Sequence, residues 1–105
     1  MDRLIEKFRR EALPKLMKEF KPEKVLLFGS RATGDARRES DIDLIVISPS
    51  FKNIPFIKRM PLVLKKVTFS NHVDYICYTR EEYENIKDAS SVIMDAREQS
   101  VELTI

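Results

Sequence analysis

Hydrophobic side chains recur along residues 2–20 with the spacing of an α-helix. One face of the predicted helix is traced by Leu4, Ile5, Phe8, Ala12, Leu16 and Phe20. Pro14 lies within this stretch and lacks the backbone N–H that would bond to the preceding turn. The pattern therefore predicts a helix over residues 2–20 that is kinked or split near Pro14.

Three short apolar runs have the length and composition of β-strands. They are VLLF at residues 25–28, DIDLIVIS at 41–48 and HVDYICYT at 72–79. The first run is apolar at every position, which is typical of a strand covered on both faces and predicts a central place in the sheet. Pro49 directly follows the second run and is expected to end that strand.

Two further segments have helical features. Residues 50–67 are ambiguous, because Pro61 interrupts an apolar spacing that otherwise suits a helix and is made by Phe56, Ile57, Met60, Val63 and Leu64. After the third strand, Thr79 and Glu82 have the spacing of a capping box, which predicts that a helix begins there.

The order of the elements defines a fold class. Residues 29–40 read as a loop that includes two helical turns, residues 90–98 as another helix and residues 101–105 as a short final strand. Helices and strands thus alternate along the chain. We expect an α/β fold in which helices flank a small mixed β-sheet.

The composition is that of an ordinary globular domain. Of the 105 residues, 43% are apolar and 34% are charged, and the net charge is +2. We therefore expect one domain over residues 1–105, no membrane span and no nucleic-acid partner. The first residues contain no apolar signal core, and the single cysteine, Cys77, is expected to be a buried thiol. The expected location is therefore cytoplasmic. The basic segment KRMPLVLKK is expected to lie on a solvated surface, and self-association is left open.

Two acids, Asp41 and Asp43, stand at the start of the second predicted strand. Successive side chains of a strand point to opposite faces, so these two carboxylates share one face. Carboxylates held side by side repel each other unless a cation lies between them, and Mg²⁺ is commonly held by one or two carboxylates together with substrate phosphates. The alternative is that both acids merely begin an exposed strand.

The two glycines of the chain, Gly29 and Gly34, both lie in the loop that precedes these acids. Gly29 and Ser30 directly follow the first strand, where a close backbone approach and a helix N-terminus would suit a phosphate group. A simple tight turn would explain the same residues, and Gly34 is read as a turn residue. Among nearby arginines, Arg31 is a candidate for phosphate contact, although a solvated side chain is the alternative.

A third acid, Asp74, lies within the otherwise apolar third strand. A buried acid is unfavourable unless it is paired or bound to metal. If the second and third strands are neighbours, Asp74 joins Asp41 and Asp43 in a cluster that can hold two metal ions about 3.5–4 Å apart. His72, the single histidine, is interpreted as a surface or strand-end residue rather than a ligand.

Together these residues resemble the minimal nucleotidyltransferases of the DNA polymerase β superfamily. The resemblance rests on Gly29–Ser30, ten intervening residues that include an Arg-x-x-Gly-x-Ala element, the Asp41-Ile42-Asp43 strand and the later Asp74. It implies that Asp41, Asp43 and Asp74 are catalytic residues and ligands of two Mg²⁺ ions. It also implies that Gly29 and Ser30 hold the β and γ phosphates of a nucleotide, with Arg31 close to them.

The same resemblance suggests an activity and a partner. Minimal members are often paired, as antitoxins, with a helical HEPN-type protein, and some of them transfer AMP to a tyrosine of that partner. We therefore expect transfer of a nucleoside monophosphate, AMP from ATP, to a hydroxyl of such a protein. Two alternatives stay open: a catalytically idle, nucleotide-binding antitoxin that acts by contact, and a nucleotidyltransferase that acts on a small molecule or RNA.

Overall fold

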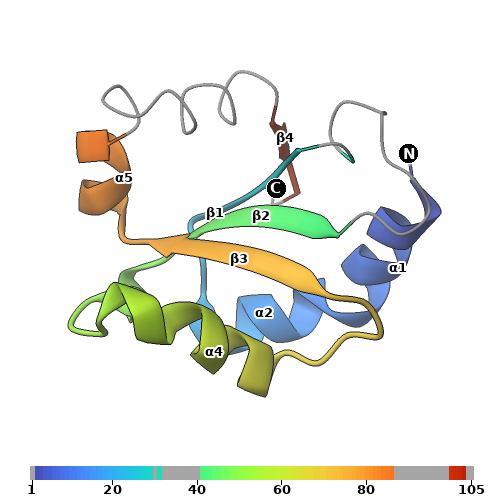
Figure 1. Cartoon of the computed structure of the whole chain (residues 1–105), viewed down its shortest axis with the longest axis horizontal. Helices are drawn as coiled ribbons and strands as arrows, with labels where there is room; N and C mark the ends of the chain where they lie inside the picture. The colour runs from blue at the N-terminus through green and yellow to red at the C-terminus, as the bar shows by residue number, and fades with distance from the viewer. Residues whose placement is uncertain (1, 30, 32–40, 87–99, 104–105) are drawn as a thin grey trace.

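The computed structural model describes residues 2–29, 31, 41–86 and 100–103, and in these residues it shows a mixed four-stranded sheet with helices (Figure 1). The strand order is β3-β2-β1-β4. The central strand β1 is antiparallel to both of its neighbours, whereas β2 and β3 are parallel. The strands are β1 (Lys24–Phe28), β2 (Ile42–Ile47), β3 (Val73–Tyr78) and β4 (Val101–Glu102). The expected α/β fold is confirmed, and β1 has the predicted covered position.

The N-terminal helix is split, as predicted, into α1 (Arg3–Glu11) and α2 (Leu13–Phe20). Pro14 lies in the first turn of α2, where a missing N–H removes no helical hydrogen bond. Asp2 caps α1, because its carboxylate accepts a hydrogen bond of 2.7 Å from the backbone N–H of Leu4. The break therefore lies at Ala12, which is itself buried.

The ambiguous segment forms a short 3₁₀-helix, η1 (Pro49–Phe51), and then α4 (Phe56–Lys66), which contains Pro61. Helix α5 (Arg80–Ile86) begins with the predicted capping box. The backbone N–H of Glu82 donates to Thr79 Oγ1 over 3.3 Å, and that of Thr79 donates to Glu82 Oε1 over 2.8 Å. The helix predicted at 90–98 lies outside the described residues.

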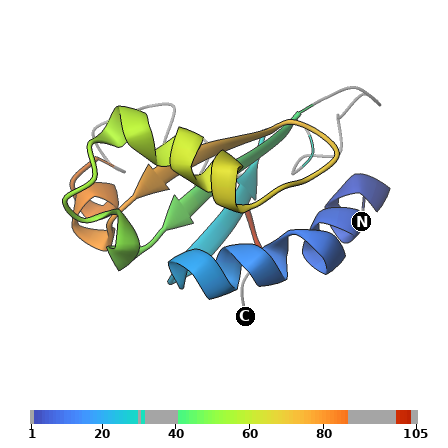
Figure 2. The ribbon, with the colours of Figure 1, turned by 90° about the horizontal axis from the view of Figure 1, so that it is seen from below.

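Helices α1, α2 and α4 lie on one face of the sheet (Figure 2). The main hydrophobic core fills the space between them and the sheet, and alternate strand residues such as Leu44, Val46, Tyr75 and Cys77 point into it. Burial raises the pKa of the Cys77 thiol to about 12, so this cysteine is the buried thiol expected from the sequence. None of the described helices has the length and apolar character needed to cross a membrane.

The opposite face of the sheet carries a smaller hydrophobic cluster. It is centred on Leu26, Ile45, Ile47 and Tyr83 of α5. Phe28 and Ile76 pack beside it and are only partly buried. We call this side of the sheet the open face, because α1, α2 and α4 all lie on the other side.

The prediction that the basic segment is a solvated surface is wrong for Arg59, which is 5% exposed. Its guanidinium pairs with both carboxylate oxygens of Glu82, at 2.5 and 3.0 Å. It also donates to the backbone carbonyls of Ile54 and Cys77. Arg59 therefore connects α4, β3 and α5, and its charge is buried only because these acceptors surround it.

Candidate active site

The strand register brings two of the predicted acids side by side. Phe28 of β1 is paired with Asp43 of β2, which is in turn paired with Asp74 of β3. Because β1 is antiparallel to β2 and β3 is parallel to it, the end of β1 and the starts of β2 and β3 meet at one edge. Asp43 and Asp74 occupy the positions that alternate with the buried core residues, so both carboxylates lie on the open face.

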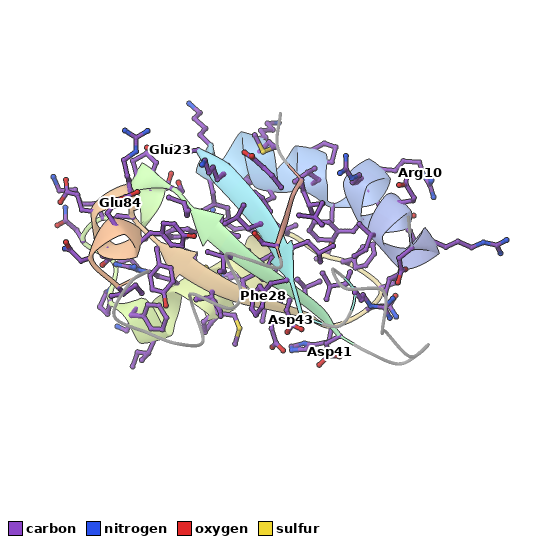
Figure 3. The ribbon with its side chains drawn as sticks, turned by 90° about the horizontal axis from the view of Figure 1, so that it is seen from above. Arg10, Glu23, Phe28, Asp41, Asp43 and Glu84 are labelled. Carbon is purple, nitrogen blue, oxygen red and sulfur yellow. The ribbon has the colours of Figure 1, made fainter. Side chains whose placement is uncertain are left out.

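Asp41 comes just before β2, and Figure 3 shows it beside Asp43 at this edge. One ligand atom each from Asp41, His72 and Asp74 lie within 4.8 Å of one another. His72 Nε2 is 2.8 Å from Asp74 Oδ1. The sequence interpretation of His72 as a surface or strand-end residue is confirmed, because it is exposed and directly precedes β3, but that interpretation did not place it beside the acids. The signal was its position two residues before Asp74, which gives both side chains the same face of the strand.

The electrostatics of Asp43 are those of a crowded carboxylate. Partial burial raises its pKa, and the charges of Asp74 and Asp41 raise it further. A hydrogen bond with Asp74 acts in the same direction, whereas the charge of His72 opposes it. A divalent cation would remove this repulsion, and carboxylate oxygens with one imidazole nitrogen form a donor set that such ions accept. The residues at this edge therefore fit a divalent cation.

Gly29 lies directly against the acids. Its φ is +74°, a left-handed conformation that favours glycine. A Cβ atom at this position would lie 2.6 Å from Asp43 Oδ2, which is closer than non-bonded atoms approach. The turn after β1 therefore needs glycine for two reasons, its backbone conformation and the carboxylate beside it.

The other residues expected to contact phosphate are placed differently. Ser30 lies outside the described residues, as do Gly34, Arg37 and Arg38. Arg31 is described, and its guanidinium pairs with Asp2 at 2.5 Å with only 4% of its side chain exposed. Although partial burial raises the pKa of Asp2, the hydrogen bonds from Leu4 N–H and Arg31 outweigh it and leave that pKa below its ordinary value. Arg31 is thus paired with the N-cap residue of α1.

A cleft of about 470 Å³ adjoins the acids. Asp43 and Asp74 line it, and most of its remaining wall is apolar. The apolar side chains of this wall include Phe28, Phe56, Ile57, Met60 and Ile76. The sequence gives Phe56, Ile57 and Met60 an apolar spacing that suits a helix, and in the helix that forms Phe56 is 51% and Ile57 is 81% exposed. Hydrophobic spacing could not show this, because the same period describes a face that packs on a core and a face that lines a cleft.

A mixed sheet that presents paired carboxylates next to a glycine turn defines the site of this small α/β protein. The chain matches the nucleotidyltransferase domain family over residues 9–100. It therefore belongs to this family, and its class is that of the transferases. No curated protein has a sequence that matches the chain.

The chain is also similar to solved structures. A crystal structure described as a nucleotidyltransferase from Sulfolobus solfataricus is 30% identical and has a TM-score of 0.60, with 84% of each chain covered. A toxin–antitoxin structure with AMP-PNP is 24% identical with a TM-score of 0.51, over 97% of this chain and 71% of that one. BolA1 from Arabidopsis thaliana is 20% identical, with a TM-score of 0.53 over 78% of this chain and 98% of its own. The last two likenesses show the fold alone. A shared fold does not by itself establish a shared function.

Proposed function

We propose that the protein is a Mg²⁺-dependent nucleotidyltransferase that transfers AMP from ATP to a hydroxyl group. The proposed acceptor is a tyrosine of a helical HEPN-type partner, for which the protein acts as a cytoplasmic antitoxin. The observation that carries the proposal is the row formed by Gly29, Asp43 and Asp74 across three adjacent segments. Membership of the nucleotidyltransferase family supports the reaction class, and the likeness to a toxin–antitoxin structure with AMP-PNP supports the nucleotide and the partner.

Each predicted residue then has a role. Asp41, Asp43 and Asp74 would hold two Mg²⁺ ions, while Gly29 and Ser30 would bind the β and γ phosphates. When bound, the ions supply charge stabilisation for the oxygens that attack and leave the phosphorus. Asp74, the acid on the outer strand of the row, would receive the proton of the acceptor, and its position beside Asp43 supports this role.

The reaction is an in-line displacement at the α-phosphorus of ATP. The acceptor oxygen forms a bond to this phosphorus, and the bond between the phosphorus and the bridging oxygen of the β phosphate breaks. Pyrophosphate leaves with the electron pair of that bond. The acceptor proton passes to the carboxylate of Asp74 and from there to solvent, so that the carboxylate is regenerated.

The cleft beside Asp74 favours an aromatic acceptor. Its wall is mostly apolar, and its charged lining residues are the neighbouring acids Asp43 and Asp74. A tyrosine has the same arrangement, because its ring is apolar and its hydroxyl is at the tip. The end of an RNA strand is polar and charged and gains little from an apolar wall, so the cleft supports the protein acceptor over RNA.

Labelled ATP, Mg²⁺ and a candidate partner protein provide the test. We expect label on the partner with the wild-type protein and none with Asp43→Asn. The matched control is Glu81→Gln, which also removes one negative charge but lies exposed on α5. If Asp43→Asn labels the partner as well as Glu81→Gln does, the proposed site is wrong.

A second candidate function is neutralisation of the partner by contact alone, with the nucleotide site idle. The exposed side chains of Phe56 and Ile57 favour it, because they offer an apolar surface that a partner could cover. A double variant, Asp41→Asn with Asp43→Asn, separates the two functions. If it folds and still neutralises the partner, contact is sufficient and transfer is not the means of neutralisation.

A further inference from the structure

We propose that His72 is a direct ligand of the divalent cation held by Asp41 and Asp74, and that this position prefers a transition-metal ion such as Mn²⁺ to Mg²⁺. The proposal rests on the proposed function, in which these acids hold metal. It adds a nitrogen ligand and a metal preference that the three aspartates alone do not imply.

The first support is the spacing of the donor atoms. In an octahedral site with ligands at about 2.1 Å, adjacent ligand atoms stand about 3.0 Å apart and opposite ones about 4.2 Å apart. His72 Nε2 and Asp74 Oδ1 are hydrogen-bonded to each other at 2.8 Å, which is also close to the distance between adjacent ligands. The ligand atoms of Asp41, His72 and Asp74 are all within 4.8 Å, so small side-chain rotations would bring them around one ion.

The second support is the way in which His72 is held. The backbone carbonyl of His72 accepts a hydrogen bond of 3.4 Å from Ile42 N–H, which continues the pairing of β2 with β3 by one residue. His72 and Asp74 are two residues apart, and the strand geometry therefore directs both toward the open face. The imidazole is consequently presented to the acids by the sheet.

Ligand chemistry gives the metal preference. Mg²⁺ favours oxygen ligands and retains several waters. Imidazole binds Mn²⁺ more readily than it binds Mg²⁺, although it binds the later transition metals more readily still. Asp43 is not a member of the group formed by Asp41, His72 and Asp74. The two metal positions of the site would therefore differ, with the nitrogen ligand at the one beside Asp74.

The chain is well suited to a spectroscopic test, since its 105 residues include one histidine. Tag-free protein is loaded with Mn²⁺ and measured by electron spin echo envelope modulation, which detects nitrogen bound to the ion. We expect imidazole modulation in the wild-type protein, a change when histidine is labelled with ¹⁵N, and loss in His72→Gln. The control is Asn71→Ala, which alters the neighbouring exposed residue and should keep the signal.

Calorimetry then distinguishes a ligand from a residue that only orients Asp74. If His72 is a ligand, His72→Gln weakens Mn²⁺ binding by about tenfold or more and leaves Mg²⁺ binding within about threefold. A residue that acts only through Asp74 would weaken both ions alike, and that result would overturn the proposal.

The outcomes also separate this inference from the proposed function. If wild-type protein binds Mn²⁺ without nitrogen modulation and still transfers AMP, His72 is not a ligand and only the inference fails. If the modulation is present but no acceptor is labelled, the inference stands and the proposed function fails. If neither ion binds, with or without ATP, both are wrong.

Discussion

The substitution Gly29→Ala tests how closely the glycine turn and the catalytic acids depend on each other. The new methyl group would be placed in a left-handed backbone conformation, which is unfavourable for alanine by about 1–2 kcal/mol. It would also lie 2.6 Å from Asp43 Oδ2. Moving that carboxylate away from its preferred rotamer adds about 0.5–1.5 kcal/mol.

The two contributions predict a loss of about 1.5–3.5 kcal/mol in the free energy of unfolding. For a domain of this size, such a loss lowers Tm by roughly 15 °C. Thermal unfolding of metal-free protein measures it, and the displaced carboxylate should also weaken divalent-metal binding.

A double-mutant cycle separates the two causes. In an Asp43→Ala background the carboxylate is gone, so that Gly29→Ala should retain the backbone strain but lose the close contact. We expect its effect on stability to be smaller there by about 0.5–1.5 kcal/mol. Equal losses in both backgrounds would refute the idea that Gly29 makes room for Asp43, and no loss in either would refute the strained turn as well.

Three further substitutions test other parts of the structure. Burial and the neighbouring carboxylates raise the pKa of Asp43 in the folded state, so its contribution to stability is present at low pH and lost as the pH rises through that raised pKa. Asp43→Asn should therefore increase Tm of the metal-free protein at neutral pH, and an unchanged Tm would contradict this. The hydrogen bonds from Arg59 lower the pKa of Glu82 to about 2, so the stabilising effect of Glu82 is present at neutral pH and is lost as the pH falls toward that value. The Glu82 side chain is 43% exposed, and we therefore expect Glu82→Gln to reduce the free energy of unfolding at pH 7 by only about 1–2 kcal/mol. Chemical denaturation measures this loss, and the difference from wild type should vanish in acid. Ile57→Asp should leave Tm nearly unchanged, since the side chain is 81% exposed, but should lower the rate of transfer to a protein acceptor; a normal rate would exclude the cleft as the acceptor site.

The strands and the capped helix could be predicted from local patterns. Apolar runs bounded by turn residues identify β1, β2 and β3, and Thr79 with Glu82 identifies the start of α5. Pro14 likewise indicates the break between α1 and α2. These features depend on residues close together in the sequence, which is why the sequence alone was sufficient.

Features that depend on distant residues were harder to predict. Arg59 appears in a basic segment, and its burial becomes understandable only once Glu82 and the carbonyl of Cys77 are beside it. Arg31 pairs with Asp2, 29 residues away, which no spacing rule predicts. His72 joins the acids through the pairing of β2 with β3. In each case the decisive partner comes from another element of the fold.

The parallel pairing of β2 with β3 has a consequence for folding accuracy. If β3 shifted by one residue along β2, Asp74 would point into the hydrophobic interior between the sheet and the helices, and Tyr75 would point away from it. An unpaired charge in that layer is strongly unfavourable. The acid proposed to act in catalysis would thus also disfavour a shifted register of β3. Replacing Asp74 by an apolar residue would therefore make the shifted register less unfavourable and would also remove the proposed activity.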